Sequence, residues 1–148
     1  MKVENQIIPE FYAEIRKRLY SHFSKADNLV ALLSDHNPKE AVFLKKINGL
    51  ILANLGNTQF DANHLSIAMN MCRTQLYRKL KPITHQSPGN YIKTIRLQKA
   101  KEFFETTDLR VNEVSYKIGF ESPSHFTKAF IKLYGVKPSL FCRKKCNK

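Results

Sequence analysis

Apolar residues recur at steps of three and four along most of this chain, which is the period of an amphipathic helix. The first such segment covers residues 10–33. Its recurring apolar positions are Phe11, Ile15, Leu19, Phe23, Ala26, Val30 and Leu33. The stripe predicts burial against the rest of the chain, against a second copy of the protein, or against a further domain.

The same period predicts further helices, and turn residues separate them. We expect helices at about residues 39–54, around Leu65 and Ala68 with Asp61 or Asn63 as the cap, at 73–81, at 88–106, around Val111 to Ile118, from Ser122 to about 134, and from 137 onward. Alternation typical of strands is scarce. The pattern therefore predicts an all-α fold.

Two stretches of the chain repeat each other, and such self-similarity is informative about architecture. Residues 69–80 resemble residues 119–130, and from Cys72 and Ser122 onward the offset is a constant fifty positions. Leu76 then corresponds to Phe126. Two copies are too few for a solenoid but suffice for two similar units set side by side.

Each copy has the residue types of a helix-turn-helix unit. Such a unit needs a small residue in its first helix, a turn residue that tolerates positive φ, and apolar anchors on the second helix. The first unit offers Ala68 and Asn70, and the second offers Gly119; Asn and Gly both enter the positive-φ region readily. The anchors are Leu76 and Leu80 in the first unit and Phe126 and Phe130 in the second.

With these anchors buried, the helical period fixes the outward face of each second helix. Arg and Lys there can donate to guanine, Gln can pair with adenine, and helix starts favour phosphate. We predict base contacts from Thr74, Gln75, Tyr77, Arg78, Ser124, His125 and Lys128, and phosphate contacts from Arg73, Lys81, Arg96, Thr127 and Lys132. The alternative is two ordinary solvated helix faces.

The distribution of charge favours the nucleic-acid interpretation. The net charge is +13, and residues 1–40 carry six basic and six acidic groups, so residues 41–148 hold all of the excess. A strongly basic domain is the electrostatic footprint of a nucleic-acid binder. A merely basic, soluble surface would give the same count.

Candidate chemistry of other kinds is scarce. Cys72, Cys142 and Cys146 have no second Cys/His pair at zinc-ligand spacing, and neither a Ser/His/Asp set nor a Gly-rich phosphate loop is legible. We therefore expect no enzyme, no metal and no cofactor. The N-terminus lacks the apolar core of a secretory signal, and the longest nearly apolar stretch, residues 49–55, is too short to cross a bilayer. A soluble, intracellular protein is expected.

At the repeated segments the chain resembles the DNA-binding domain of AraC/XylS-type transcription regulators, most of all those at the C-terminal end of bacterial hybrid two-component regulators. The matching pieces lie between about residues 40 and 143: Leu65-x-x-Ala68, residues 72–81, Ser87-Pro88, Tyr91-Ile92, Arg96-Leu97-x-x-Ala100, Val114, residues 118–120, residues 122–130, and Gly135-x-x-Pro138-Ser139-x-Phe141. Two features depart from the family pattern. Cys72 stands where the family usually has a Ser cap, which predicts a less firm start of the first recognition helix, and the first unit has no Gly at its turn.

The resemblance implies two homeodomain-like three-helix units, joined by a rigid central helix, that insert their recognition helices into adjacent major-groove segments. We accordingly expect an N-terminal helical extension or linker at residues 1–39 and a double helix-turn-helix domain at 40–148. Within the latter, subdomain one covers about 40–86, the linker helix 88–106 and subdomain two 107–143.

For function, the resemblance implies a sequence-specific regulator of transcription initiation in the bacterial cytoplasm, associated with the nucleoid. Activation through contact with RNA polymerase is the expected mode. The expected partner is double-stranded DNA, without a membrane, and the helix at 10–33 is a candidate for self-association or for contact with a further domain. The alternative function is a non-specific, architectural DNA-binding protein that uses the same charge without reading bases.

Overall fold

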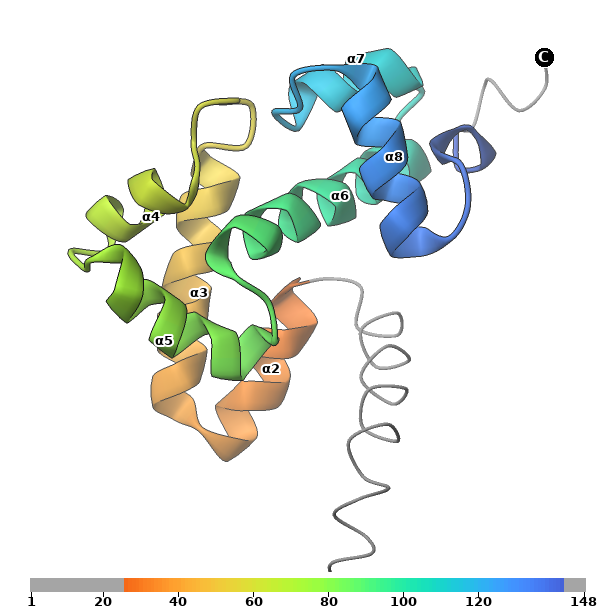
Figure 1. Cartoon of the computed structure of the whole chain (residues 1–148). Helices are drawn as coiled ribbons and strands as arrows, with labels where there is room; N and C mark the ends of the chain where they lie inside the picture. The colour runs from red at the N-terminus through yellow and green to blue at the C-terminus, as the bar shows by residue number, and fades with distance from the viewer. Residues whose placement is uncertain (1–25, 143–148) are drawn as a thin grey trace, which may run out of the picture.

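A computed structural model of the chain describes residues 26–142 (Figure 1). The helices are α2 (Ala26–His36), α3 (Pro38–Ala53), α4 (Ala62–Ala68), α5 (Arg73–Thr84), α6 (Pro88–Thr106), α7 (Val111–Lys117) and α8 (Pro123–Tyr134), followed by a short 3-10 helix, η1 (Pro138–Leu140). The described part of the chain contains no strand, which confirms the all-α prediction. The predicted helix at 10–33 lies largely outside the described residues, as do the basic residues 143–145 and Cys146.

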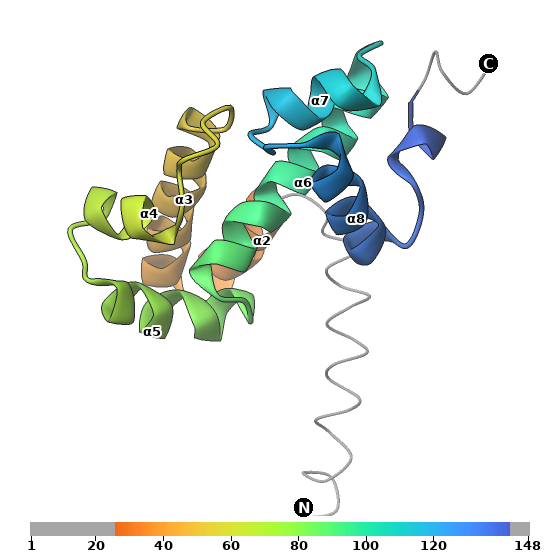
Figure 2. The ribbon, with the colours of Figure 1, turned by 45° about the horizontal axis from the view of Figure 1, so that its top comes forward.

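The long helix α6 runs between the group of helices α2–α5 and the pair α7 and α8 (Figures 1 and 2), and it contributes to an apolar core in each group. The first half of α6 supplies Tyr91, Ile92 and Ile95 to a core shared with α3, α4 and α5. Its second half supplies Leu97, Ala100 and Phe104 to a core shared with α7 and α8. The apolar positions of one helix therefore serve two units, as expected of a central helix joining two helix-turn-helix subdomains.

The part of the N-terminal extension that is described packs onto the first unit. Helix α2 lies against α3, and its side chains Val30 and Leu33 cover the first core. Asn37 then ends the turn and caps α3, since its side-chain oxygen accepts a hydrogen bond from the N–H of Glu40 at 3.2 Å. Residues 26–36 thus act as a covering helix of the first unit.

Helix starts follow the residues that sequence reasoning selected. Asp61 caps α4, Ser87 caps α6 and Ser122 caps α8, each by accepting from a backbone N–H three residues later. Pro88 and Pro123 occupy the first helical positions, where a missing N–H costs no helical hydrogen bond. These caps fix where each short helix begins, and so which side chains face outward.

The first recognition helix continues beyond its predicted end. We expected it to stop near Lys81, but α5 runs to Thr84 with Pro82 inside it. Pro82 cannot donate to the Arg78 carbonyl, but the last turn of the helix is still closed: the Thr84 hydroxyl donates to the Leu80 carbonyl at 3.0 Å and the His85 N–H to the Lys81 carbonyl at 2.8 Å. His85 closes the helix in the left-handed region, at φ 61°.

The Asp61 cap makes the stability of α4 depend on pH. Two hydrogen bonds from His64, first from its backbone N–H and then from its ring, lower the pKa of this exposed carboxyl. Because the pKa of Asp61 is lower in the folded protein than in the unfolded chain, the ionised carboxylate stabilises the fold at pH values above the ordinary pKa of about 3.9. This stabilisation is lost as the pH falls through the pKa of the folded state.

We therefore expect the difference in unfolding free energy between the wild type and Asp61→Asn to shrink as the pH is lowered from 5 to 3. Because Asn caps well but carries no charge, the change should be about a few tenths of a kcal/mol. Urea titrations at each pH measure it. A difference that stays constant across this window would show that the charge of Asp61 does not matter.

Candidate nucleic-acid interface

The two helix-turn-helix turns are built alike. Asn70 and Gly119 hold the left-handed conformation at φ 56° and 90°, as predicted from their residue types. After each turn a backbone N–H returns to the first helix: Met71 to Ser66 at 2.9 Å and Phe120 to Ser115 at 3.0 Å. The turn residues are therefore 49 positions apart rather than fifty, because the second unit has one more residue between its turn and its cap.

The small residue of the first unit was assigned wrongly. Ala68 is exposed, whereas Ser66, two residues earlier in α4, is only 2% exposed. Ser115, which is fully buried, has the equivalent place in the second unit. Each Ser satisfies its hydroxyl by donating to a carbonyl three residues earlier, at 2.7 and 2.9 Å, so a polar side chain is tolerated where packing requires a small one.

Helix α5 buries its anchors and exposes the predicted contact residues. Leu76 and Leu80 have no exposed surface. The base-contact candidates Thr74, Gln75, Tyr77 and Arg78 and the phosphate-contact candidates Arg73 and Lys81 are all exposed. Arg73, Thr74, Tyr77 and Arg78 line an open groove of about 630 Å³, which Ala62 and the start of α6 close on the other side.

Gln75 has a second role that sequence reasoning missed. Its side-chain oxygen accepts from the N–H of Cys72 at 3.1 Å, while its own N–H donates to the Cys72 sulfur at 3.5 Å, so the two residues form a capping box. Bidentate pairing with adenine needs the amide oxygen as well as the amide nitrogen. Gln75 therefore has to exchange its cap for such a base contact.

The sulfur cap leads to a prediction for stability. Sulfur is a weak acceptor, whereas Ser is among the best caps. At the matching position of α8 the Ser122 hydroxyl accepts from the His125 N–H at 3.2 Å. We expect Cys72→Ser to raise the melting temperature and to add up to about 1 kcal/mol to the free energy of unfolding. The reciprocal variant Ser122→Cys is the control and should lose a similar amount; no change in either variant would contradict the assigned caps.

Helix α8 presents the second set of candidates. Phe126 and Phe130 are fully buried, whereas Ser124, His125, Lys128 and Lys132 are exposed and Thr127 is half-buried. Lys132 lines a second groove, of about 290 Å³, together with residues of the first half of α6, among them Asn90 and Lys93. Lys93 is exposed and was not singled out from the sequence, although its place in the second turn of α6, six residues after the Ser87 cap, was a usable signal.

Residues at the start of α6 contribute to the lining of both grooves. Gln86 lines the groove beside α8, while the next residues, Ser87 and Pro88, line the groove beside α5. Helix α5 packs in the core of the first half of α6 and α8 in the core of its second half, so the two recognition helices lie along one central helix (Figures 1 and 2). Of the predicted contact residues of α8, only Lys132 lines a groove with the first half of α6.

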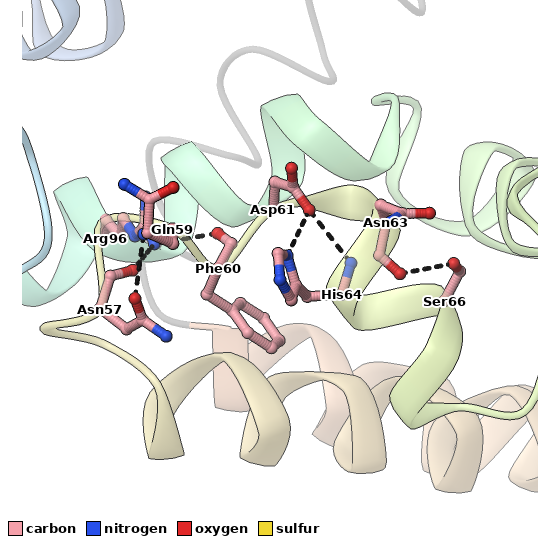
Figure 3. A network of polar contacts seen from close by, with 8 residues as sticks. All are labelled: Asn57, Gln59, Phe60, Asp61, Asn63, His64, Ser66 and Arg96. Atoms are coloured by element: carbon pink, nitrogen blue, oxygen red, sulfur yellow. Dashed lines mark hydrogen bonds and ion pairs between the residues drawn. The ribbon is translucent and has the colours of Figure 1, made fainter.

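Arg96 is the exception among the predicted phosphate contacts. Its guanidinium points to the loop between α3 and α4, where Nη2 donates to the carbonyls of Asn57 at 2.8 Å and Phe60 at 3.1 Å (Figure 3). Partial burial lowers the pKa of Arg96, but an arginine remains protonated at neutral pH. Because this side chain is engaged inside the protein, we no longer include it among the proposed phosphate contacts.

The described residues offer no other obvious site. Within 26–142 no group of three or more His, Cys, Asp or Glu side chains is placed to hold a metal ion. The same residues include no helix with the length and apolarity needed to span a bilayer. The features that stand out are the two capped helices and the basic grooves beside them, which define a double helix-turn-helix domain of the DNA-binding class.

Comparison with known proteins agrees with this class. Residues 65–144 match the family described as "Helix-turn-helix domain". The chain is 33% identical over 128 residues to "Histidine kinase P4" of Formosa agariphila, and 32% identical over 107 residues to the HTH-type transcriptional regulator GbdR of Pseudomonas aeruginosa. These alignments cover 86% and 72% of this chain but only 9% and 28% of the two relatives.

A solved structure shares the fold as well. The DNA-binding domain of AdpA, a global transcriptional factor crystallised in complex with a target DNA, is 27% identical with a TM-score of 0.61, covering 68% of this chain and 89% of that domain. The chain belongs to the AraC-type family of helix-turn-helix, DNA-binding transcription regulators.

Proposed function

We propose that this chain is the sequence-specific DNA-reading part of a transcription regulator, and that it inserts α5 and α8 into adjacent major-groove segments of one duplex. The observation that carries the proposal is a pair of capped helices, α5 and α8, that pack on the two halves of α6, each with a buried apolar face and an exposed polar face. A single chain would then read an asymmetric site of about two helical turns without a dimer.

The proposal assigns two kinds of contact. Base edges are read by Thr74, Tyr77 and Arg78 of α5 and by Ser124, His125 and Lys128 of α8, with Gln75 joining when its cap opens. Phosphates are bound by Arg73, Lys81, Thr127 and Lys132, to which we add Lys93 because it lines the groove with Lys132. All but Thr127 are exposed, so binding requires no unfolding of either unit.

We also propose a regulatory output, which is suggested by the family. We propose that the chain acts in the bacterial cytoplasm, on nucleoid DNA, and that it activates transcription initiation through contact with RNA polymerase. It has no catalytic role in this proposal. The relatives are several times longer than this chain, so the signal to which such a regulator responds would be received elsewhere.

A non-specific, architectural DNA-binding protein is the second candidate. The net charge of +13 favours it, since phosphate neutralisation alone gives sequence-independent binding. The hydrogen bond between the Gln75 side-chain oxygen and the Cys72 N–H also favours the architectural function, because it occupies one group that could otherwise contact a base.

Selection from random duplexes at two salt concentrations separates the two functions. A sequence-specific regulator enriches a motif with two parts, and the enrichment persists at the higher salt because base contacts release few counterions. The architectural protein enriches no motif, and its binding falls steeply with salt on every sequence. That second outcome would reject the proposed function.

A further inference from the structure

Three backbone segments meet around the Arg96 side chain, at a place that belongs to neither recognition helix. They are the turn at residues 57–60 between α3 and α4, the turn directly after α3 at Leu55 and Gly56, and the turn between α7 and α8 at Gly119. We call these segments, together with Arg96, the joint. The first two belong to the first helix-turn-helix unit and the third belongs to the second.

Arg96 holds the first unit through carbonyl oxygens. The turn at 57–60 is closed by a hydrogen bond from the Phe60 N–H to the Asn57 carbonyl at 3.1 Å, and the Asn57 side chain accepts from the Gln59 N–H at 2.9 Å. Arg96 Nη2 donates to both ends of this turn (Figure 3). The next residue after the turn is Asp61, the cap of α4, so Arg96 acts on the element that positions the first helix-turn-helix.

Gly119 brings the second unit to the same point. A Cβ atom at this residue would lie 2.4 Å from the Leu55 carbonyl oxygen and 3.2 Å from the Arg96 guanidinium carbon. A Cβ at Gly56 would be 3.4 Å from the Lys117 carbonyl. The turn before α8 is therefore packed directly on the turn that follows α3 and on the Arg96 guanidinium.

The joint matters because the two units have separate cores. Helix α6 supplies buried residues to both cores. Leu55, which follows α3 in the first unit, packs against the second core. Arg96 Nε is buried without a hydrogen-bond partner among the described residues, and an unsatisfied buried donor lowers the stability of the fold. A planar, multi-donor guanidinium is nevertheless suited to hold several carbonyls in one geometry.

We propose that Arg96 is a positioning residue that locks the orientation of the two helix-turn-helix units and thereby makes the protein select one spacing between its two half-sites. The second part rests on the proposed function. A shift of one base pair displaces a half-site along the duplex and rotates it by about a tenth of a turn, so only a rigid pair of recognition helices discriminates strongly between spacings.

The first test needs no DNA. Residual dipolar couplings report the alignment of each unit separately. One alignment tensor should fit both units in the wild type and in Lys99→Met, a control that removes a positive charge three residues further along α6. Arg96→Met should require two different tensors, and Arg96→Lys, which keeps a donor, should be intermediate. If Arg96→Met folds and one tensor still fits both units, the inference is wrong. If Arg96→Met does not fold, a single tensor for Arg96→Lys would contradict the inference in the same way.

The second test uses duplexes in which the selected half-sites are moved apart or together by one or two base pairs. The wild type and Lys99→Met should prefer one spacing by at least about tenfold. Arg96→Met should keep its affinity for each isolated half-site while its preference falls to within about threefold. An unchanged spacing preference in Arg96→Met would overturn the inference but leave the proposed function standing. A wild type that enriches no motif with two parts would reject the proposed function. In that case the alignment tensors would still test whether Arg96 fixes the orientation of the two units.

Discussion

Phe130→Ala is expected to lower the free energy of unfolding by about 3–5 kcal/mol, the usual cost of deleting a fully buried aromatic ring. Phe130 has no exposed surface and lies at the centre of the second core. Its ring centroid is 6.0 Å from that of Phe104, 5.6 Å from those of Phe126 and Phe141, and 4.7 Å from that of Tyr134. Removing the Phe130 ring leaves a cavity, because the surrounding rings belong to α6, α8 and the segment after η1 and cannot all move in to fill it.

The matched control is the next residue of α8. Ile131 is 37% exposed, so Ile131→Ala should cost about 1 kcal/mol or less. Both values come from urea unfolding followed by circular dichroism. Similar losses for the two variants would show that the second unit is not organised around Phe130.

Arg78→Ala and Lys128→Ala should each weaken binding to the preferred DNA site by about 1–3 kcal/mol and relax the base preference at one position. The two side chains lie on the exposed faces of α5 and α8, where they can donate to guanine O6 and N7. Because they sit on different helices, their losses should add. Binding isotherms on the selected site and on single-base variants measure both effects.

Lys81→Ala and Lys132→Ala are the controls for this pair. As phosphate contacts they should weaken binding on all sequences alike and reduce the salt dependence by about one counterion each. Equal losses on specific and random DNA for all four variants would contradict the division into base and phosphate contacts.

Local signals allowed much of this fold to be predicted. Caps and prolines such as Ser87-Pro88 and Ser122-Pro123 act within one helical turn, so their effect is legible in the sequence. Asn70 and Gly119 were identified as turn residues for the same reason. The apolar anchors of α5 and α8 follow from helical period alone, and their burial leaves the predicted contact residues outside.

The errors arose where tertiary contacts decide. The first recognition helix was predicted to end near Lys81, but the buried Thr84 hydroxyl and the His85 backbone complete a further turn of α5. Ala68 is the predicted small residue, yet the buried small residue is Ser66, because a helical Ser can satisfy its hydroxyl by donating to a nearby carbonyl. The hydrogen bonds of Arg96 could not be predicted either, because the carbonyls that it contacts lie 36 and 39 residues away in the sequence.

The central claim is that α5 and α8 read two neighbouring stretches of one duplex, and guanine methylation interference on the selected site tests it most directly. The account predicts two clusters of interfering guanines about one helical turn apart, of which Arg78→Ala removes only one and Lys128→Ala only the other. A single cluster, or the loss of both clusters in either variant, would contradict it.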